Sequence, residues 1–242
     1  MDQCPHCHGL LPENAETCPN CGQASKVADP LTVTARASGR PLPLGDYIKT
    51  GWDLFKQYPG GFVGFFLIYV VISAILNRAP FLGLPVAAII STPLMLGNFI
   101  VSAKLLQGQP VEFSDFFAAF NFFLPLVVVS VITSILVTLG LLLLVIPGIY
   151  LAVAFMFAAT LVVDRGLDFW PAMDLSRRTV QPMWFGMFTF LLLLFLINLA
   201  GVLCLGLGLL VSAPLSFCAL TAAYADIFGL QSDYSGKFPR RT

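Results

Sequence analysis

The chain has 242 residues, of which 57% are hydrophobic and only 11% are charged, whereas an ordinary soluble domain carries about 25% charged residues. Apolar runs long enough to cross a bilayer recur along it, which excludes a soluble globular protein and predicts an integral membrane protein. The 13 basic and 13 acidic residues cancel, so the net charge gives no reason to expect nucleic acid as a partner.

Residues 1–25 contain the first predicted element, a small metal-binding hairpin. Four of the six cysteines form two Cys-x2-Cys pairs, Cys4 with Cys7 and Cys18 with Cys21. Two such turns on a short hairpin place four thiolates at tetrahedral corners, about 2.3 Å from one Zn²⁺. Because so short a segment cannot bury a core, the metal would supply the folding free energy. The sequence therefore predicts a zinc ribbon with one structural Zn²⁺ per chain.

Other interpretations of these cysteines stay open. Iron fits the same four-sulfur geometry, and a disulfide pair is an alternative that a reducing cytosol disfavours. A thioredoxin-like redox site needs only one Cys-x2-Cys, and the second pair follows too closely for that domain to fit between them. We expect His6 and His8 to be exposed polar residues of the hairpin, because four cysteines already complete the metal shell.

The segment "CPHCHGLLPENAETCPNCG" resembles the short zinc ribbons found at the N-termini of many bacterial membrane proteins. Their pattern is Cys-Pro-x-Cys-Gly, a polar hairpin and a second Cys-Pro-x-Cys-Gly; here the first glycine, Gly9, comes one place late. The resemblance implies metal binding and says almost nothing of biological role. Residues 26–44 are rich in Pro, Ser, Thr, Ala and Gly, which predicts a flexible linker.

Residues 45–230 predict an all-α polytopic membrane domain. Six apolar runs are expected to be transmembrane helices: 60–77, 83–104, 124–145, 148–163, 184–203 and 206–228. Pro147-Gly148 predicts the turn between the third and the fourth. All but one of the 13 Lys and Arg fall on one side of these spans, and Arg78 alone falls on the other. The positive-inside rule then predicts an inner-membrane protein with both termini in the cytoplasm and a cytoplasmic tail at 231–242. The first 50 residues hold no apolar run, so we expect no cleavable signal peptide.

Three amphipathic stretches precede the odd-numbered spans and predict interfacial helices. They cover residues 46–58, 112–123 and 168–181, and each carries large aromatic residues at helical spacing. Each leads through a proline into its span: Pro59, Pro125 and Pro182. Each even-numbered span ends at a glycine: Gly108, Gly166 and Gly229. This pattern indicates a threefold internal repeat, with chance similarity of apolar sequences as the rival explanation. We expect the prolines to be elbows that lay the three stretches at a large angle to the membrane normal.

The third of these units resembles a broad group of bacterial membrane domains, among them the one attached to some glycerophosphodiester phosphodiesterases. The matching residues are Gly166, Ala172, Ser176, Arg177, Arg178 and Trp184. The resemblance covers roughly residues 45–230 and carries no catalytic residue. That group's soluble phosphodiesterase domain has no counterpart in this sequence, so its activity does not transfer. We expect Arg177 and Arg178 to favour anionic lipid in the surrounding bilayer.

Polar residues in the predicted spans are few. No ionisable residue lies well inside one, and Lys104, Asp164 and Asp226 lie near the cytoplasmic ends of even-numbered spans. They are boundary residues, or else form an interhelical ion pair such as Lys104 with Asp226. Three asparagines are expected to join helices by hydrogen bonds, and two cysteines to pack in apolar surroundings: Asn77, Asn98, Asn198, Cys204 and Cys218.

The sequence contains no constellation of catalytic residues. It therefore predicts a non-enzymatic inner-membrane protein whose zinc ribbon binds a protein partner, in a scaffold role. The alternative is a transporter, channel or lipid-handling protein that works through the six-helix bundle. An enzyme is the third hypothesis.

Overall fold

The computed structural model describes residues 2–3, 10–11, 42–76, 78, 83–204 and 206–230. The chain divides into two compact units, Met1–Thr34 and Ala35–Thr242. In the first unit, strand β1 (Asp2–Gln3) pairs antiparallel with β2 (Leu10–Leu11), with Gln3 opposite Leu10. The predicted zinc ligands lie outside the described residues, as do most of the linker and the predicted tail: Cys4, Cys7, Cys18, Cys21, 26–41 and 231–242.

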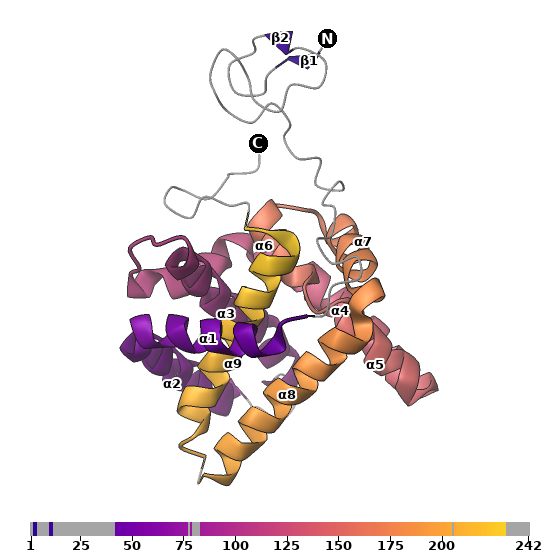
Figure 1. The fold of residues 1–242 in the computed structure, drawn as a ribbon. Coiled ribbons are helices and arrows are strands. Elements are labelled where there is room, and N and C mark those ends of the chain that lie inside the picture. The colour runs from indigo at the N-terminus through magenta and orange to yellow at the C-terminus, as the bar shows by residue number, and fades with distance from the viewer. Residues whose placement is uncertain are drawn as a thin grey trace. The chain divides into compact units, whose positions relative to one another are not determined.

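The described part of the second unit is helical, and its elements form three successive sets (Figure 1). The first set is α1 (Leu44–Gln57), α2 (Pro59–Leu76) and α3 (Gly83–Leu106). The second is the 3₁₀ helix η1 (Phe113–Phe122), α4 (Phe123–Leu143), and the pair α5 (Val145–Ala154) and α6 (Ala158–Arg165). The third is α7 (Phe169–Val180), the 3₁₀ turn η2 (Gln181–Met183), α8 (Trp184–Leu203) and α9 (Leu209–Phe228). Each set is thus a short helix followed by a helical hairpin.

Several of these helices are long and apolar enough to cross a bilayer. Within the described ranges they are Phe113–Leu143, Val145–Arg165, Phe169–Leu203 and Leu209–Phe228, and the bent pair Leu44–Gln57 and Pro59–Ile75 makes a fifth if it counts as one span. The prediction of an all-α chain with several helices able to span a membrane is therefore confirmed.

The elbow predicted at Pro59 is present. The axes of α1 and α2 differ by 94°, and Tyr58 between them has non-helical φ −143° and ψ 55°. At the other two junctions the helical backbone continues, and only Phe122 (φ −106°, ψ 21°) and Met183 (φ −114°, ψ 19°) leave the α region. The elbows predicted at Pro125 and Pro182 are therefore wrong: Phe113–Leu143 and Phe169–Leu203 each continue as one helix into the span.

The turn predicted at Pro147-Gly148 is wrong. The chain turns at Leu144, whose φ of −157° and ψ of 131° are extended, and Pro147 and Gly148 lie in the first turn of α5. Proline is tolerated there because the first turn of a helix needs no N–H donor. Gly148 serves close packing: a Cβ added to Gly140 of α4 would lie 2.9 Å from the Gly148 Cα.

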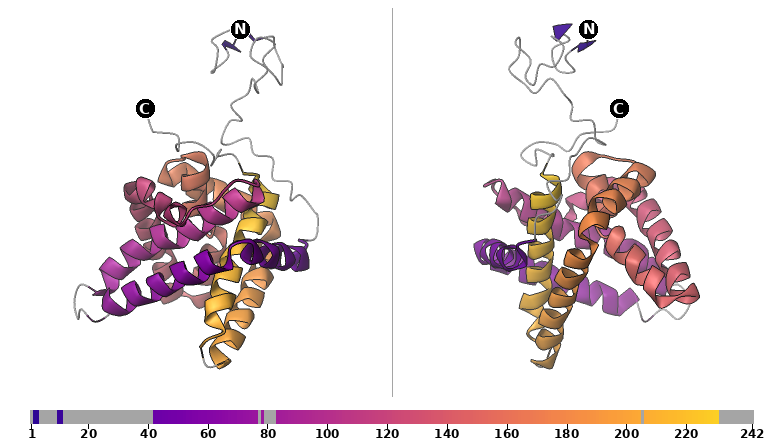
Figure 2. Two further views of the ribbon diagram at one scale, coloured as in Figure 1. Left: turned by 90° about the vertical axis from the view of Figure 1, so that its left-hand side faces the viewer. Right: turned by 45° about the vertical axis from the view of Figure 1, so that its right-hand side comes forward.

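The three sets pack in a ring. The second helix of each hairpin lies against the short helix of the next set: α3 against η1, α6 against α7, and α9 back against α1. Figures 1 and 2 show α1 crossing α9, which joins the first set to the last. We call α3, α5–α6 and α9 the inner helices, since most of the buried core lies on them and on the short helices that pack against them.

The glycine that ends each inner helix has a left-handed backbone. The φ angles are +67° at Gly108, +63° at Gly166 and +74° at Gly229. A positive φ is unfavourable for residues with a Cβ, so glycine at the C-terminal end stops each helix at the predicted point.

Candidate functional site: a cleft at an interrupted inner helix

The inner helix of the second set is interrupted. After Ala154 the residues 155–157 form a turn, and α6 begins at Ala158. Such a break frees backbone groups, which must find partners where no water is available. The Ser176 hydroxyl of α7, itself fully buried, donates to the Ala154 carbonyl at 2.8 Å. The Phe155 carbonyl accepts from the Ala158 N–H at 3.0 Å. Hydrogen bonds therefore satisfy the backbone carbonyls of residues 154 and 155 at this turn, which stabilises it.

An inner cavity of about 220 Å³ lies beside this break, between the three inner helices. Its lining is mostly apolar, with hydroxyls from Thr92, Thr160, Thr221 and Tyr224. The Tyr224 hydroxyl donates to Asp164 Oδ2 at 2.8 Å, and Asp164 itself is not part of the lining. The cavity thus has an apolar lining with a few hydroxyls.

Aromatic rings pack around the Tyr224–Asp164 pair. The Tyr224 ring centroid lies 5.7 Å from that of Phe157 and 5.0 Å from that of Phe228. The Arg165 Nη2 donates to the Phe228 carbonyl at 2.7 Å, which ties the end of α6 to the end of α9. These contacts hold α6 and α9 together at the charged end of the bundle.

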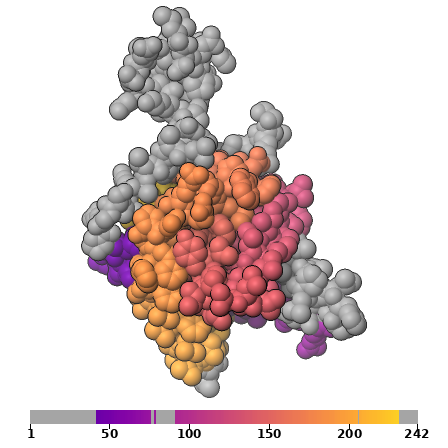
Figure 3. Space-filling view, turned by 90° about the vertical axis from the view of Figure 1, so that its right-hand side faces the viewer, coloured from indigo at the N-terminus to yellow at the C-terminus, as the bar shows by residue number. Residues whose placement is uncertain are grey.

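A second, more open cavity of about 450 Å³ lies between α4 and the break, and we call it the side cavity. Hydroxyls of α4 line it: Ser130, Thr133, Ser134 and Thr138. The inner and side cavities are adjacent, because Thr92, Met156 and Ala159 line both, and we call the pair the cleft. No charged residue lines either cavity. Figure 3 shows the side of the molecule on which the α4–α6 hairpin stands beside α7 and α8.

Sequence reasoning missed this hydroxyl row. Its signal is present in "SVITSILVT", where Ser130, Thr133, Ser134 and Thr138 recur at helical spacing in an otherwise apolar span. The interruption of α5–α6 has no comparable local signal, because "AVAFMFAAT" contains neither proline nor glycine.

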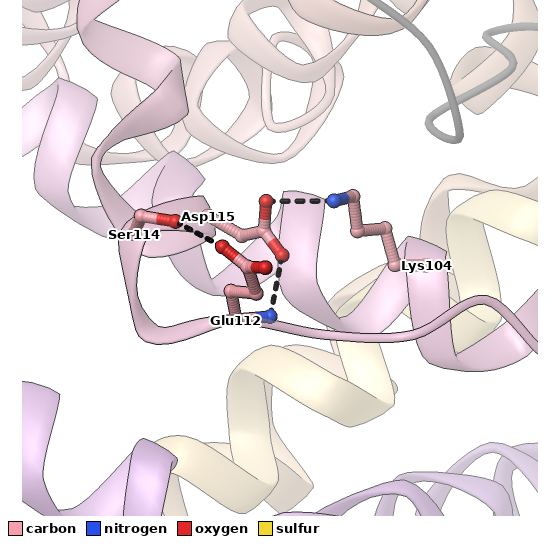
Figure 4. Close-up of polar contacts among 4 residues, drawn as sticks. All are labelled: Lys104, Glu112, Ser114 and Asp115. Atoms are coloured by element: carbon pink, nitrogen blue, oxygen red, sulfur yellow. Dashed lines mark hydrogen bonds and ion pairs between the residues drawn. The ribbon is translucent and has the colours of Figure 1, made fainter.

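The ion pair between Lys104 and Asp226 is not formed. Lys104 Nζ donates to Asp115 Oδ1 at 2.6 Å, and Asp226 accepts from the Tyr47 hydroxyl at 2.7 Å. The backbone N–H of Glu112 donates to the second Asp115 oxygen at 2.8 Å, as Figure 4 shows. The reason is the ring packing, which places η1 beside the end of α3 and α1 beside α9.

Arg177 and Arg178 both lie on the exposed side of α7. Their guanidinium groups share one carboxylate, with Nη2 of Arg177 at 3.1 Å from Asp174 Oδ1 and Nε of Arg178 at 2.7 Å from Oδ2. The three side chains therefore carry a single net positive charge.

Two of the remaining polar residues behave as the sequence predicts. Asn198 of α8 donates to Ser216 of α9 at 2.7 Å and accepts from Ser212 at 3.0 Å, so it joins two helices. Cys218 is buried and accepts from the Ser102 hydroxyl at 3.4 Å.

Three other residues either differ from the expectation or lie outside the described residues. The expectation that Cys204 is a packing residue is wrong, because Cys204 is exposed at the tip of the α8–α9 hairpin. The Asn98 side-chain oxygen is buried with no hydrogen-bond partner within the described residues, so it joins no helix through that atom. Asn77 lies outside the described residues.

No group of three or more His, Cys, Asp or Glu side chains is placed to hold a metal ion in the part of the chain that the structure describes. The four cysteines predicted to bind zinc lie outside that part.

Comparisons with protein-family models, with curated proteins and with solved structures found no match to this chain.

Proposed function

We propose that this chain is a non-enzymatic inner-membrane protein that holds an apolar ligand from the bilayer in the cleft. The interrupted inner helix carries the proposal. The turn at residues 155–157 lines both cavities, and irregular backbone at membrane depth is tolerated where it lines a cavity. The lining is apolar with a few hydroxyls and no charge, which matches the usual chemistry of a site for an apolar ligand.

The proposal includes six spans with both termini in the cytoplasm. Each helical set contributes one hairpin, and α2 and α3 complete the six with the four stretches named above. The described basic residues Lys104, Arg165, Arg177 and Arg178 lie at the hairpin bases, and Arg78 follows the outer end of α2. This distribution is the one that the positive-inside rule favours.

A larger side chain that fills the cleft tests whether a ligand binds there. Ala159 lines both cavities, so Ala159→Phe should occupy their shared part and displace whatever binds there. Ala74→Phe is the matched control, because Ala74 is exposed on α2. The chain is purified in mild detergent, and lipids are extracted and counted per chain by mass spectrometry. We expect one lipid species to be enriched in the wild type and in Ala74→Phe, and lost in Ala159→Phe. The same lipid complement in all three proteins contradicts the proposal.

The partner-binding role is the second candidate. The strand pair β1–β2 favours it, because Cys4 and Cys7 fall between the two paired strands in the sequence. Four thiolates from Cys4, Cys7, Cys18 and Cys21 would hold one structural Zn²⁺, and the ribbon would present a small folded surface to a protein in the cytoplasm.

Metal analysis tests this ribbon. Purified protein should carry close to one zinc per chain, and Cys18→Ser should lose it without preventing membrane insertion. Exposed Cys204→Ser is the control and should keep the metal. Iron as the dominant metal would contradict the zinc assignment, as would zinc retained after all four cysteines are replaced.

Anionic lipid is the partner proposed for Arg177 and Arg178. Both arginines are exposed, and Trp170 on the same short helix is 67% exposed, as an interfacial helix requires. Because Asp174 neutralises one of the two charges, we expect only about 1 kcal/mol of attraction near an anionic surface.

A further inference from the structure

The hydroxyl groups of the cleft differ from others in the same bundle. Thr189 of α8 donates to the Phe185 carbonyl at 2.8 Å, and Ser216 of α9 donates to that of Ser212 at 2.8 Å. This bond to the preceding turn is how a membrane helix ordinarily satisfies a serine or threonine. Ser130 and Thr221 also donate to carbonyls of the preceding turn, although they line the cleft.

Four hydroxyls of the cleft have no such partner. Thr133, Ser134 and Thr138 in the side cavity and Thr160 in the inner cavity make no hydrogen bond among the described residues. Thr160 is buried and Thr133 is half-buried, whereas Ser134 and Thr138 are exposed on α4. In a bilayer, a hydroxyl without a partner carries a free-energy cost whether protein or hydrocarbon surrounds it. These donors are therefore available to a ligand in the cleft.

The depth of the α4 hydroxyls in the bilayer limits which ligands can reach them. Thr133 and Ser134 lie at the middle of α4, a helix of 21 residues that is about 31 Å long. The middle of such a span is the middle of the hydrocarbon core. The ester carbonyls of a glycerolipid stay near the headgroups, because its polar end is hydrated. A ligand that binds these hydroxyls must instead have an acceptor group that can leave the membrane–water interface and enter the hydrocarbon core.

The residues that line the cleft limit the charge and the shape of the ligand. With no charged residue in the lining, an ionised group would be buried without a counter-ion. The α4 hydroxyls line the side cavity and Thr160 lines the inner cavity, and Met156 and Ala159 line both. A ring with acceptors on opposite edges suits this arrangement, and Phe155 and Met156 offer it aromatic and thioether contacts.

We propose that the cleft binds a quinone-type lipid, an uncharged ring with two carbonyl acceptors and a long apolar chain. One carbonyl accepts from the α4 hydroxyls and the other from Thr160, and the chain follows the apolar wall of the inner cavity. This inference rests on the proposed binding of an apolar bilayer ligand and names its chemical class.

Photolabelling tests the inference. The full chain is reconstituted in vesicles of phosphatidylethanolamine and phosphatidylglycerol with a benzoquinone that carries a decyl chain and a photoreactive azide. Labelled peptides are mapped by mass spectrometry. We expect labels in residues 130–138 and 155–160, and competition by the same quinone without azide. A diacylglycerol with a photoreactive acyl chain, used in a separate arm, should not label these segments preferentially.

Isosteric variants identify the donors. The triple variant Thr133→Val, Ser134→Ala and Thr138→Val should reduce specific labelling about tenfold, since each 1.4 kcal/mol of lost hydrogen bonding is a factor of ten in affinity. Thr160→Val should also reduce it. Thr189→Val on α8 is the control and should label as the wild type does, because its hydroxyl bonds only to its own helix. Thermal unfolding in detergent shows whether each variant is folded.

Three outcomes overturn the inference: equal labelling of the triple variant and the wild type, labels spread evenly over the bundle, or preferential labelling of the cleft by the diacylglycerol. If Ala159→Phe loses its co-purifying lipid while any of these results is obtained, the binding of an apolar ligand stands and only its assignment as a quinone fails. If Ala159→Phe keeps its lipid, the proposed function itself fails.

Discussion

One carboxylate, Asp115, joins the end of an inner helix to the next set. It accepts from Lys104 of α3 through one oxygen and from the Glu112 backbone through the other. The side chains of Lys104 and Asp115 are only 14% and 15% exposed, so removing one partner leaves the other charge poorly solvated. We expect Lys104→Met to lower the stability by about 2 kcal/mol, the usual size for a hydrogen bond to a charged group. Thermal unfolding in detergent measures it.

The matched control is an ion pair of the same chemistry on the surface. Lys56 and Asp53 of α1 lie 2.9 Å apart but are 54% and 53% exposed. Exposed pairs contribute little, so Lys56→Met should change the unfolding midpoint much less than Lys104→Met. If both substitutions lower the unfolding midpoint equally, the Lys104–Asp115 pair contributes no more stability than a surface ion pair, and the prediction is wrong.

At the scale of elements, the packing of α1 on α9 joins the two ends of the ring. The two helices meet at Gly51, where an added Cβ would lie 2.7 Å from the backbone nitrogen of Ala219. We expect Gly51→Ala to push the helices apart and to lower the stability by about 2 kcal/mol, as overpacking does. Gly45→Ala lies on the same helix with no atom within 4 Å of the new Cβ, and should be neutral or mildly stabilising. Detergent unfolding curves of the pair decide this.

The short helices also carry exposed aromatic residues. Along η1 and the first residue of α4, four phenylalanines stand in a row with neighbouring ring centroids 6.0 to 6.5 Å apart: Phe113, Phe117, Phe120 and Phe123. Each is 37–40% exposed, and Trp52 on α1 is 43% exposed. Rings placed this way favour the headgroup boundary of the membrane.

Depth measurements test this interfacial position on α1. Because α1 meets α2 at 94°, labels along the Trp52 side of α1 should be quenched as if at one shallow depth. Labels along α2 give the contrast, since depth should change there by up to about 1.5 Å per residue. A steady change of depth along α1 would mean that it continues the span.

At the scale of the whole molecule, three hairpins predict three returns of the chain to the cytoplasmic face. Reporter fusions at residue 25 and at the C-terminus should both report cytoplasm, and a fusion at Arg78 should report the opposite side. Opposite results for the two termini would require an odd number of spans. Fusions near Leu144 and Gly206, at the tips of the second and third hairpins, should agree with Arg78.

Within the membrane domain, the sequence located most elements to within a few residues. The predicted span 184–203 coincides with α8, and 60–77 and 83–104 differ from α2 and α3 by one or two residues. The terminal glycines were also found. These features are local: an apolar run must stay in the bilayer, and glycine ends a helix wherever the chain takes a positive φ.

The tertiary structure decided the features that depend on contacts between different helices. Lys104 pairs with Asp115 and not with Asp226 because η1 packs beside α3, and no spacing along the chain reveals that neighbour. The break at 155–157 persists because Ser176, on a different helix, satisfies the Ala154 carbonyl. The cleft lies where that turn meets α3, α4 and α9. The sequence by itself determined which segments are apolar, where they end and which carry aromatic residues, since these follow from each residue's own transfer free energy and backbone preference. Which surfaces face each other was decided by packing between segments far apart in the chain.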